Sequence, residues 1–143
     1  MTGIYNLGDA SVTAAVTDSV ITSGTSAAGA TQALIDRLEG MTAATIYAEF
    51  SYGSGGTTCA VIVQTSINQG SDWIDVARFD FTTANGTKVA NLSGLLSKAV
   101  TAVSAISSEG VTDGVLGDRL RCKVTSTGTY AGNTAVSVRA AVR

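Results

Sequence analysis

Histidine is absent from the 143-residue chain, which removes the side chain most often used as a general base or metal ligand. The two cysteines therefore have no histidine that could activate them as nucleophiles. No serine or lysine stands in a recognisable nucleophile motif. Gly53, Gly55 and Gly56 follow a predicted strand without opening a helix, so they do not resemble a phosphate-binding loop. We predict that the chain is not an enzyme and binds no cofactor.

Four residues carry side-chain oxygens that could bind a calcium ion. The candidates are Asn68, Asp72, Asp75 and Asp80. Their spacing lacks the Asp-x-Asp-x-Asp-Gly series of a calcium-binding loop. We therefore predict no metal site, and expect these residues to form a turn and an Asp–Arg pair instead.

A sugar could stack on aromatic rings if they gathered on the surface. Trp73 is the only tryptophan, and Tyr47, Tyr52 and Tyr130 are the tyrosines that could join it. Large aromatic side chains are mostly used to fill cores, so we predict that Trp73 is a core residue. For the tyrosines both locations stay open.

Both cysteines alternate with apolar residues that we assign to the core. Cys59 alternates with Val61 and Val63, and Cys122 alternates with Leu120 and Val124. Free cysteine behaves as a small apolar residue in such positions. The first residues lack the features of a secretion signal, so we expect synthesis in a reducing cytoplasm and two buried free thiols.

Positive charge is concentrated at the end of the chain. Residues 119–143 hold five basic residues and no acid: Arg119, Arg121, Lys123, Arg139 and Arg143. If the last two strands pair as a hairpin, these side chains line one face. We take them, together with Ile4 and Tyr5, as candidate partner contacts; a solvated outer face is the alternative. No aromatic residues interleave them and the net charge is −2, so we predict no nucleic-acid partner.

Alternating apolar residues predict strands near 45–52, 57–66, 73–83, 118–126 and 133–143, with a weaker first strand near 12–17. The strand 57–66 is apolar on both faces, which predicts a central position in a sheet. Residues 84–87 carry the Asn-Gly signal of a hairpin. Residues 93–110 combine helical spacing with many Ser, Thr and Val residues, so a short helix and an irregular excursion stay open.

Strict alternation in 73–83 would bury Asp75 without a partner, which is costly. We therefore predict a β-bulge near Ala77 and Arg78, which places Phe79 and Phe81 in the core.

The composition fits an all-β protein: 45% of the residues are hydrophobic, only 14% are charged, and proline is absent. The fold predicted is an antiparallel β-sandwich or jelly roll with at most one short helix. We divide it into a low-complexity N-terminal strand or arm, 1–30, and a sandwich domain, 31–143. No apolar run approaches the ~18 residues that span a bilayer, so we predict no membrane partner.

Two segments resemble small virion proteins of tailed phages. Gln64–Ala77 is similar to a pattern of Gln-Thr-Ser, then Asp/Asn-x-Gly, then Trp-x-Asp-Ile/Val-Ala. Gly117–Val124, followed by Gly128-Thr129-Tyr130, is similar to their Gly-Asp-Arg-Leu-Arg-Val-Lys strand and Gly-Thr-Tyr turn, with Cys122 replacing the usual valine.

The resemblance implies a capsid decoration, or cement, protein with a β-sandwich body. Such a protein binds the exterior of the assembled phage head and stabilises it. The implied partners are the major capsid protein and further copies of the chain, for example as a homotrimer, with residues 1–30 as a reaching arm. The alternatives are a carbohydrate- or receptor-binding sandwich of a tail fibre and a neck or tail component.

Overall fold

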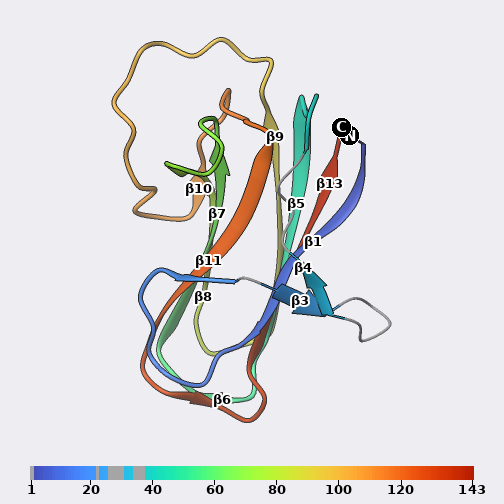
Figure 1. The fold of residues 1–143 in the computed structure, drawn as a ribbon. Helices are drawn as coiled ribbons and strands as arrows, with labels where there is room; N and C mark the ends of the chain where they lie inside the picture. The colour runs from blue at the N-terminus through green and yellow to red at the C-terminus, as the bar shows by residue number, and fades with distance from the viewer. Residues whose placement is uncertain (1, 22, 26–30, 34–37) are drawn as a thin grey trace.

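The computed structural model describes residues 2–21, 23–25, 31–33 and 38–143, and these form two large antiparallel sheets with no helix (Figure 1). Sheet A has the order β1–β13–β5–β9. Its strands are β1 (Gly3–Ser11), β13 (Ala135–Val142), β5 (Ala43–Ser51) and β9 (Gly86–Ser93). Sheet B has the order β10–β8–β7–β11–β2. Its strands are β10 (Gly110–Val111), β8 (Ile74–Phe81), β7 (Thr58–Ser66), β11 (Arg119–Thr127) and β2 (Ser19–Val20).

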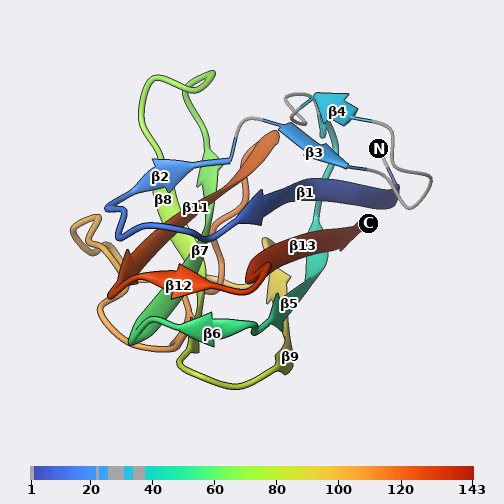
Figure 2. The same cartoon turned by 90° about the horizontal axis from the view of Figure 1, so that it is seen from below.

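Two short ribbons complete the described structure. One pairs β6 (Ser54–Gly55) with β12 (Tyr130–Ala131) at the lower end of the sandwich, and the other pairs β3 (Ser23–Thr25) with β4 (Thr31–Ala33) beside β1 (Figure 2). The antiparallel β-sandwich is thus confirmed.

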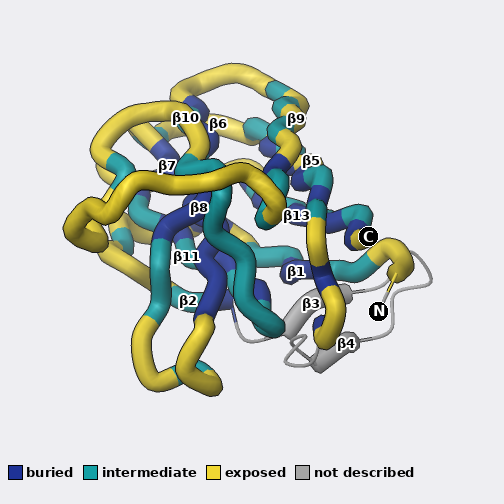
Figure 3. The backbone as a smooth tube through the Cα atoms, turned by 90° about the horizontal axis from the view of Figure 1, so that it is seen from above, coloured by how far each residue is buried: buried dark blue, intermediate teal, exposed yellow. Residues whose placement is uncertain are grey.

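The core lies between the two sheets, and every second residue of β11 and β13 is buried there. Figure 3 colours the backbone by this burial. Its members include the predicted residues Val61, Val63, Phe79, Phe81, Leu120 and Val124. Strand β7 is buried along eight of its nine residues and lies in the centre of sheet B, as its two apolar faces indicated. The rings of Phe50 and Phe81 stack with centroids 5.1 Å apart in this core.

The hairpin predicted at 84–87 is wrong, and the hairpin of the last two strands, on which the shared basic face depended, does not form. Strands β11 and β13 belong to different sheets, and so do β8 and β9. The connection after β11 crosses to sheet A instead of turning back, and its β12 segment pairs with β6 on the way. Buried Tyr130 fills this end of the core and donates a hydrogen bond from Oη to the carbonyl oxygen of Thr82 at 2.7 Å. A tyrosine that points inward from the connection favours a path across the end of the core. A tight hairpin turn at the edge of one sheet would leave this side chain outside the core.

The N-terminal segment contributes a strand to each sheet. Strand β1 pairs with β13 in sheet A, and β2 pairs with β11 in sheet B. The weak strand expected at 12–17 is instead the crossing connection between them. Of the predicted arm 1–30, residues 1, 22 and 26–30 lie outside the described residues.

The bulge in β8 lies one residue earlier than predicted. Ala77 pairs with Val63 and Asp75 pairs with Gln64, so Val76 is the extra residue. The bulge keeps Asp75 out of the core, as expected, because Val76, Phe79 and Phe81 face the core and Asp75 lies on the opposite face of sheet B. The carboxylate is nevertheless buried on that face, where it has polar partners.

Residues 94–109 form an irregular arch rather than a helix, seen at the upper left of Figure 1. Most of its residues are exposed. The helical alternative is therefore wrong, because the arch has no neighbouring surface against which a helix could bury an apolar stripe.

Candidate functional site

The two segments that carry the resemblance lie side by side in sheet B. The first covers the end of β7, the following turn and the start of β8, and the second covers the start of β11. Because β11 pairs with β7, Arg121 stands opposite Gln64, which in turn stands opposite Asp75. Side chains more than 40 residues apart in sequence thus form one group on the outer face of the sheet.

A chain of hydrogen bonds joins this group. Arg121 Nε donates to Gln64 Oε1 at 2.8 Å, and Gln64 Nε2 donates to Asp75 Oδ1 at 2.7 Å. The second carboxylate oxygen of Asp75 accepts the backbone N–H of Ile106, in the arch, at 3.1 Å. Arg78 reaches the same part of the arch by donating to the carbonyl oxygen of Ile106 at 3.0 Å. The network therefore links the outer face of sheet B to the arch.

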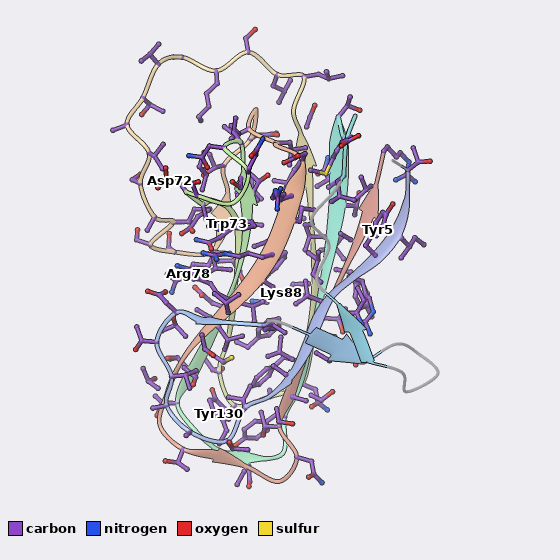
Figure 4. The ribbon with its side chains drawn as sticks, viewed as in Figure 1. Tyr5, Asp72, Trp73, Arg78, Lys88 and Tyr130 are labelled. Atoms are coloured by element: carbon purple, nitrogen blue, oxygen red, sulfur yellow. The ribbon has the colours of Figure 1, made fainter. Side chains whose placement is uncertain are left out.

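Trp73 belongs to the same surface. The guanidinium carbon of Arg121 lies 4.2 Å from the centroid of the Trp73 ring, which is a cation–π arrangement. Trp73 Nε1 donates to the carbonyl oxygen of Gly70 at 3.1 Å, so the turn before β8 fixes the ring. The prediction that Trp73 is a core residue is wrong: its side chain is only half-buried, and the guanidinium of Arg121 covers one face of its ring. Figure 4 shows Trp73 in the upper half of the molecule, near Asp72.

Burial and charge act in opposite directions on Arg121. Partial burial lowers the pKa of its guanidinium, and the carboxylate of Asp75 opposes that shift. An arginine stays protonated under such conditions, so the surface keeps a fixed positive charge beside an aromatic ring. We call Gln64, Trp73, Asp75, Arg119 and Arg121 the Trp–Arg surface.

Arg119 lies on the same strand face as Arg121, two residues away. Its Nε is buried without a hydrogen-bond partner, and the nearest carboxylate oxygen, from Asp118, is 3.7 Å away. Lys123, the third basic residue of β11, forms a 2.9 Å ion pair with Asp18. The pKa of Asp18 is lowered by this hydrogen bond and by the charge of Lys123.

The remaining predicted contact residues lie on sheet A, so the structure does not bring the basic set together. Arg139 forms a 2.9 Å ion pair with Asp9. Arg143 is exposed next to the end of β13. Ile4 is 80% exposed, whereas Tyr5 packs partly against the core.

The calcium candidates are also separated. Asn68 and Asp72 bond to each other within the turn, where Asn68 Nδ2 donates to Asp72 at 2.7 Å. Asp75 is held by Gln64, and Asp80 forms an Asp–Arg pair with Arg78 at 2.8 Å. Among the described residues, no group of three possible metal ligands gathers.

The cysteines are free and buried. Burial raises the pKa of the Cys59 thiol to about 11, and it raises the pKa of Cys122 further. Thiols held protonated in this way are poor nucleophiles, which fits a packing role.

The aromatic residues do not form a sugar-stacking platform with Trp73. Tyr52 and Tyr130 surround Phe50, and Figure 4 shows Tyr130 at the opposite end of the sandwich from Trp73. Tyr47 lies on sheet A. One face of Trp73 is already covered by Arg121.

Sequence reasoning missed Gln64 as a member of this surface. The signal was present, because the polar Gln64 directly follows the apolar run 59–63 in the strand that was expected to be covered on both faces. A polar group in such a position needs a hydrogen-bond partner.

The chain matches no family model, no curated protein and no solved structure among those compared. Within the part of the chain that the structure describes, no helix is long and apolar enough to cross a membrane.

Proposed function

We propose that the chain is a capsid decoration protein that binds the exterior of an assembled phage head through the Trp–Arg surface. The observation that carries the proposal is the convergence of the two resembling segments in one bonded group of Gln64, Trp73, Asp75 and Arg121. Tryptophan and arginine are the residue types most enriched among the side chains that dominate binding energy.

The geometry suits a docking role better than catalysis. The buried carboxylate of Asp75 has both oxygens engaged by donors, so it holds the surface in shape. Trp73 and Arg121 are thereby fixed before any partner arrives, which lowers the entropic cost of binding. A guanidinium above an indole presents a rigid, positively charged plate, and Arg119 adds a second charge beside it. An acidic, flat surface on the major capsid protein fits this plate.

Stabilisation of the head follows from mass action. A ligand that binds the assembled shell more tightly than free subunits shifts the equilibrium toward the shell. Many copies on one lattice multiply this effect without strong individual contacts. Such a role places the protein in the virion, on the capsid exterior, after synthesis in the host cytoplasm.

The test is co-sedimentation of the purified chain with expanded heads stripped of it, with unassembled capsid subunits as the comparison. We expect saturable binding to the heads and none to the subunits. Trp73→Ala and Arg121→Ala should each weaken binding at least ~30-fold, as expected for residues that dominate an interface. Arg143→Ala is the matched control, because this exposed arginine follows the end of β13, a strand of the other sheet, and its loss should leave binding unchanged.

Failure to bind heads contradicts the decoration role. Equal losses in Arg121→Ala and Arg143→Ala would keep the role but remove the Trp–Arg surface as its contact. Binding to isolated neck or tail fractions instead of heads would favour the neck or tail alternative.

A further inference from the structure

The arch at 94–109 exposes apolar side chains that the sandwich does not cover. Val100 is fully exposed, Leu95 is 77% exposed and Val103 is 69% exposed. Leu96 is also more than half exposed, and so is Ile67, in the turn after β7. Isolated apolar residues are common on protein surfaces, but five in one region are not.

The arch is anchored at both ends. Near its start, Ser93 N donates to Asp113 Oδ1 at 2.7 Å and Gly114 N donates to the carbonyl oxygen of Ser93 at 2.9 Å. Near its end, Ile106 is held on one side by Asp75 and on the other by Arg78. No hydrogen bond within the described residues joins 97–105 to the sheets. The apolar stretch is therefore presented away from the body between two fixed points.

The arch and the turn after β7 border an open cavity of about 440 Å³. Ile67, Ile74, Val100, Val103 and Val115 are among its lining residues. Ile67, Val100 and Val103 line this cavity and are each more than half exposed, and the exposed Leu95 and Leu96 belong to the same arch. Monomers rarely expose so many apolar side chains in one patch.

Charge identifies the partner that fits this surface. The arch holds two charged side chains, Lys98 and Glu109, and Glu109 is paired with Lys88 of β9, so the arch offers little for electrostatic recognition. Permanent interfaces between identical chains are apolar, whereas surfaces that stay exposed until a partner arrives are more polar. A neutral, apolar arch matches the first kind, and the Trp–Arg surface matches the second. We infer that the arch is the surface through which copies of this chain associate with one another in solution.

This inference goes beyond the proposed function, because self-association through the arch needs no capsid. It assigns the arch and the Trp–Arg surface to different partners. A free chain with an uncovered arch would be prone to aggregation, and a second copy removes that apolar surface from water.

The test is the mass of the purified full chain by light scattering and sedimentation velocity, from ~1 to ~100 µM, a range in which interfaces of micromolar affinity associate. The test variant combines Val100→Asp and Val103→Asp. Both side chains are exposed in a single copy, so the fold should be retained, and circular dichroism and urea unfolding check this. Val89→Asp is the control, because Val89 is 62% exposed on β9 in sheet A.

We expect the wild type and Val89→Asp to be oligomers, and the double variant to be a monomer with self-association weakened roughly 30-fold or more. A monomeric wild type across the range would overturn the inference. If that monomer binds heads and the double variant does not, the arch contacts the capsid subunit instead. Equal effects of the double variant and Val89→Asp would also overturn it. Head binding is measured separately, so its failure leaves this result intact.

Discussion

Asp75→Asn tests whether the buried carboxylate organises the Trp–Arg surface and the arch together. Both of its oxygens accept hydrogen bonds, one from Gln64 Nε2 at 2.7 Å and one from the backbone N–H of Ile106 at 3.1 Å. An asparagine has only one oxygen, so in either orientation its amide N–H₂ faces one of the two donors. The substitution also removes the negative charge that counteracts the lowering of the Arg121 pKa by burial.

The magnitude follows from these contacts. Losing one buried hydrogen bond to a charged group and leaving a donor unpaired costs ~1.5–3 kcal/mol. The neutral amide is easier to bury than a carboxylate, which offsets part of this loss. We expect the free energy of unfolding to fall by about 2 kcal/mol, which for a typical urea m-value lowers the unfolding midpoint by ~1 M.

Urea unfolding followed by circular dichroism measures this change, and amide hydrogen exchange at Ile106 shows whether the end of the arch is released. Asp72→Asn is the control, because Asp72 is exposed and the amide oxygen of the introduced asparagine can still accept the hydrogen bond from Asn68. The control should change stability by less than ~0.5 kcal/mol. An Asp75→Asn variant as stable as the control, with unchanged exchange at Ile106, would refute the structural role of this network.

Three further predictions concern the fold. Gly117→Ala should unfold at lower urea concentration by at least ~1 M, because its Cβ would lie 1.8 Å from a β7 carbonyl oxygen, whereas Gly110→Ala should be near neutral because its Cβ meets nothing closer than 4.0 Å. The pKa of Glu109 is lowered chiefly by the hydrogen bond from Lys88, so this pair stabilises the fold above about pH 4.5 and loses that contribution as the pH falls through the lower folded-state value. Urea unfolding of Glu109→Gln should therefore show a deficit of about 0.5 kcal/mol at pH 7 that shrinks toward pH 3; a constant deficit would contradict this. Cys59 should react with a thiol reagent at pH 8 only on unfolding, since its pKa is about 11 and it is buried, and fast labelling of the native chain would contradict this.

The sequence pattern predicts which side chains face the core but not which sheet a strand joins. In β11 and β13 the alternation of buried residues follows the predicted parity. The same alternation is compatible with a hairpin within one sheet or a crossing between two. The seven-residue connection between these strands, 128–134, is long enough for either, and burial of Tyr130 over the open end of the core selects the crossing.

The arch shows a second limit of periodicity. Leu92, Leu96, Val100 and Val103 have helical spacing, yet only Leu92 is buried, at the end of β9. Helical spacing produces a helix only where a neighbouring surface can take the apolar stripe. In this chain that surface is missing from the single copy, which is the same observation that led to the proposed self-association.

The Trp–Arg surface was only partly predictable. Arg119 and Arg121 were recognised as outward-facing, because they alternate with Leu120 and Cys122. Their neighbours came from a strand pairing across more than 50 residues, which no local pattern specifies. Asp75 was expected to avoid burial because its partner, Gln64, was not recognised.

The most direct test of the central claim is an electron cryo-microscopy reconstruction of heads decorated with the purified chain. We predict density on the outside of the shell in which the face of sheet B that bears Trp73 and Arg121 lies against the capsid subunits. The arch at 94–109 should contact a neighbouring copy. Heads incubated with saturating protein that show no added density, or copies bound through sheet A, would contradict the account.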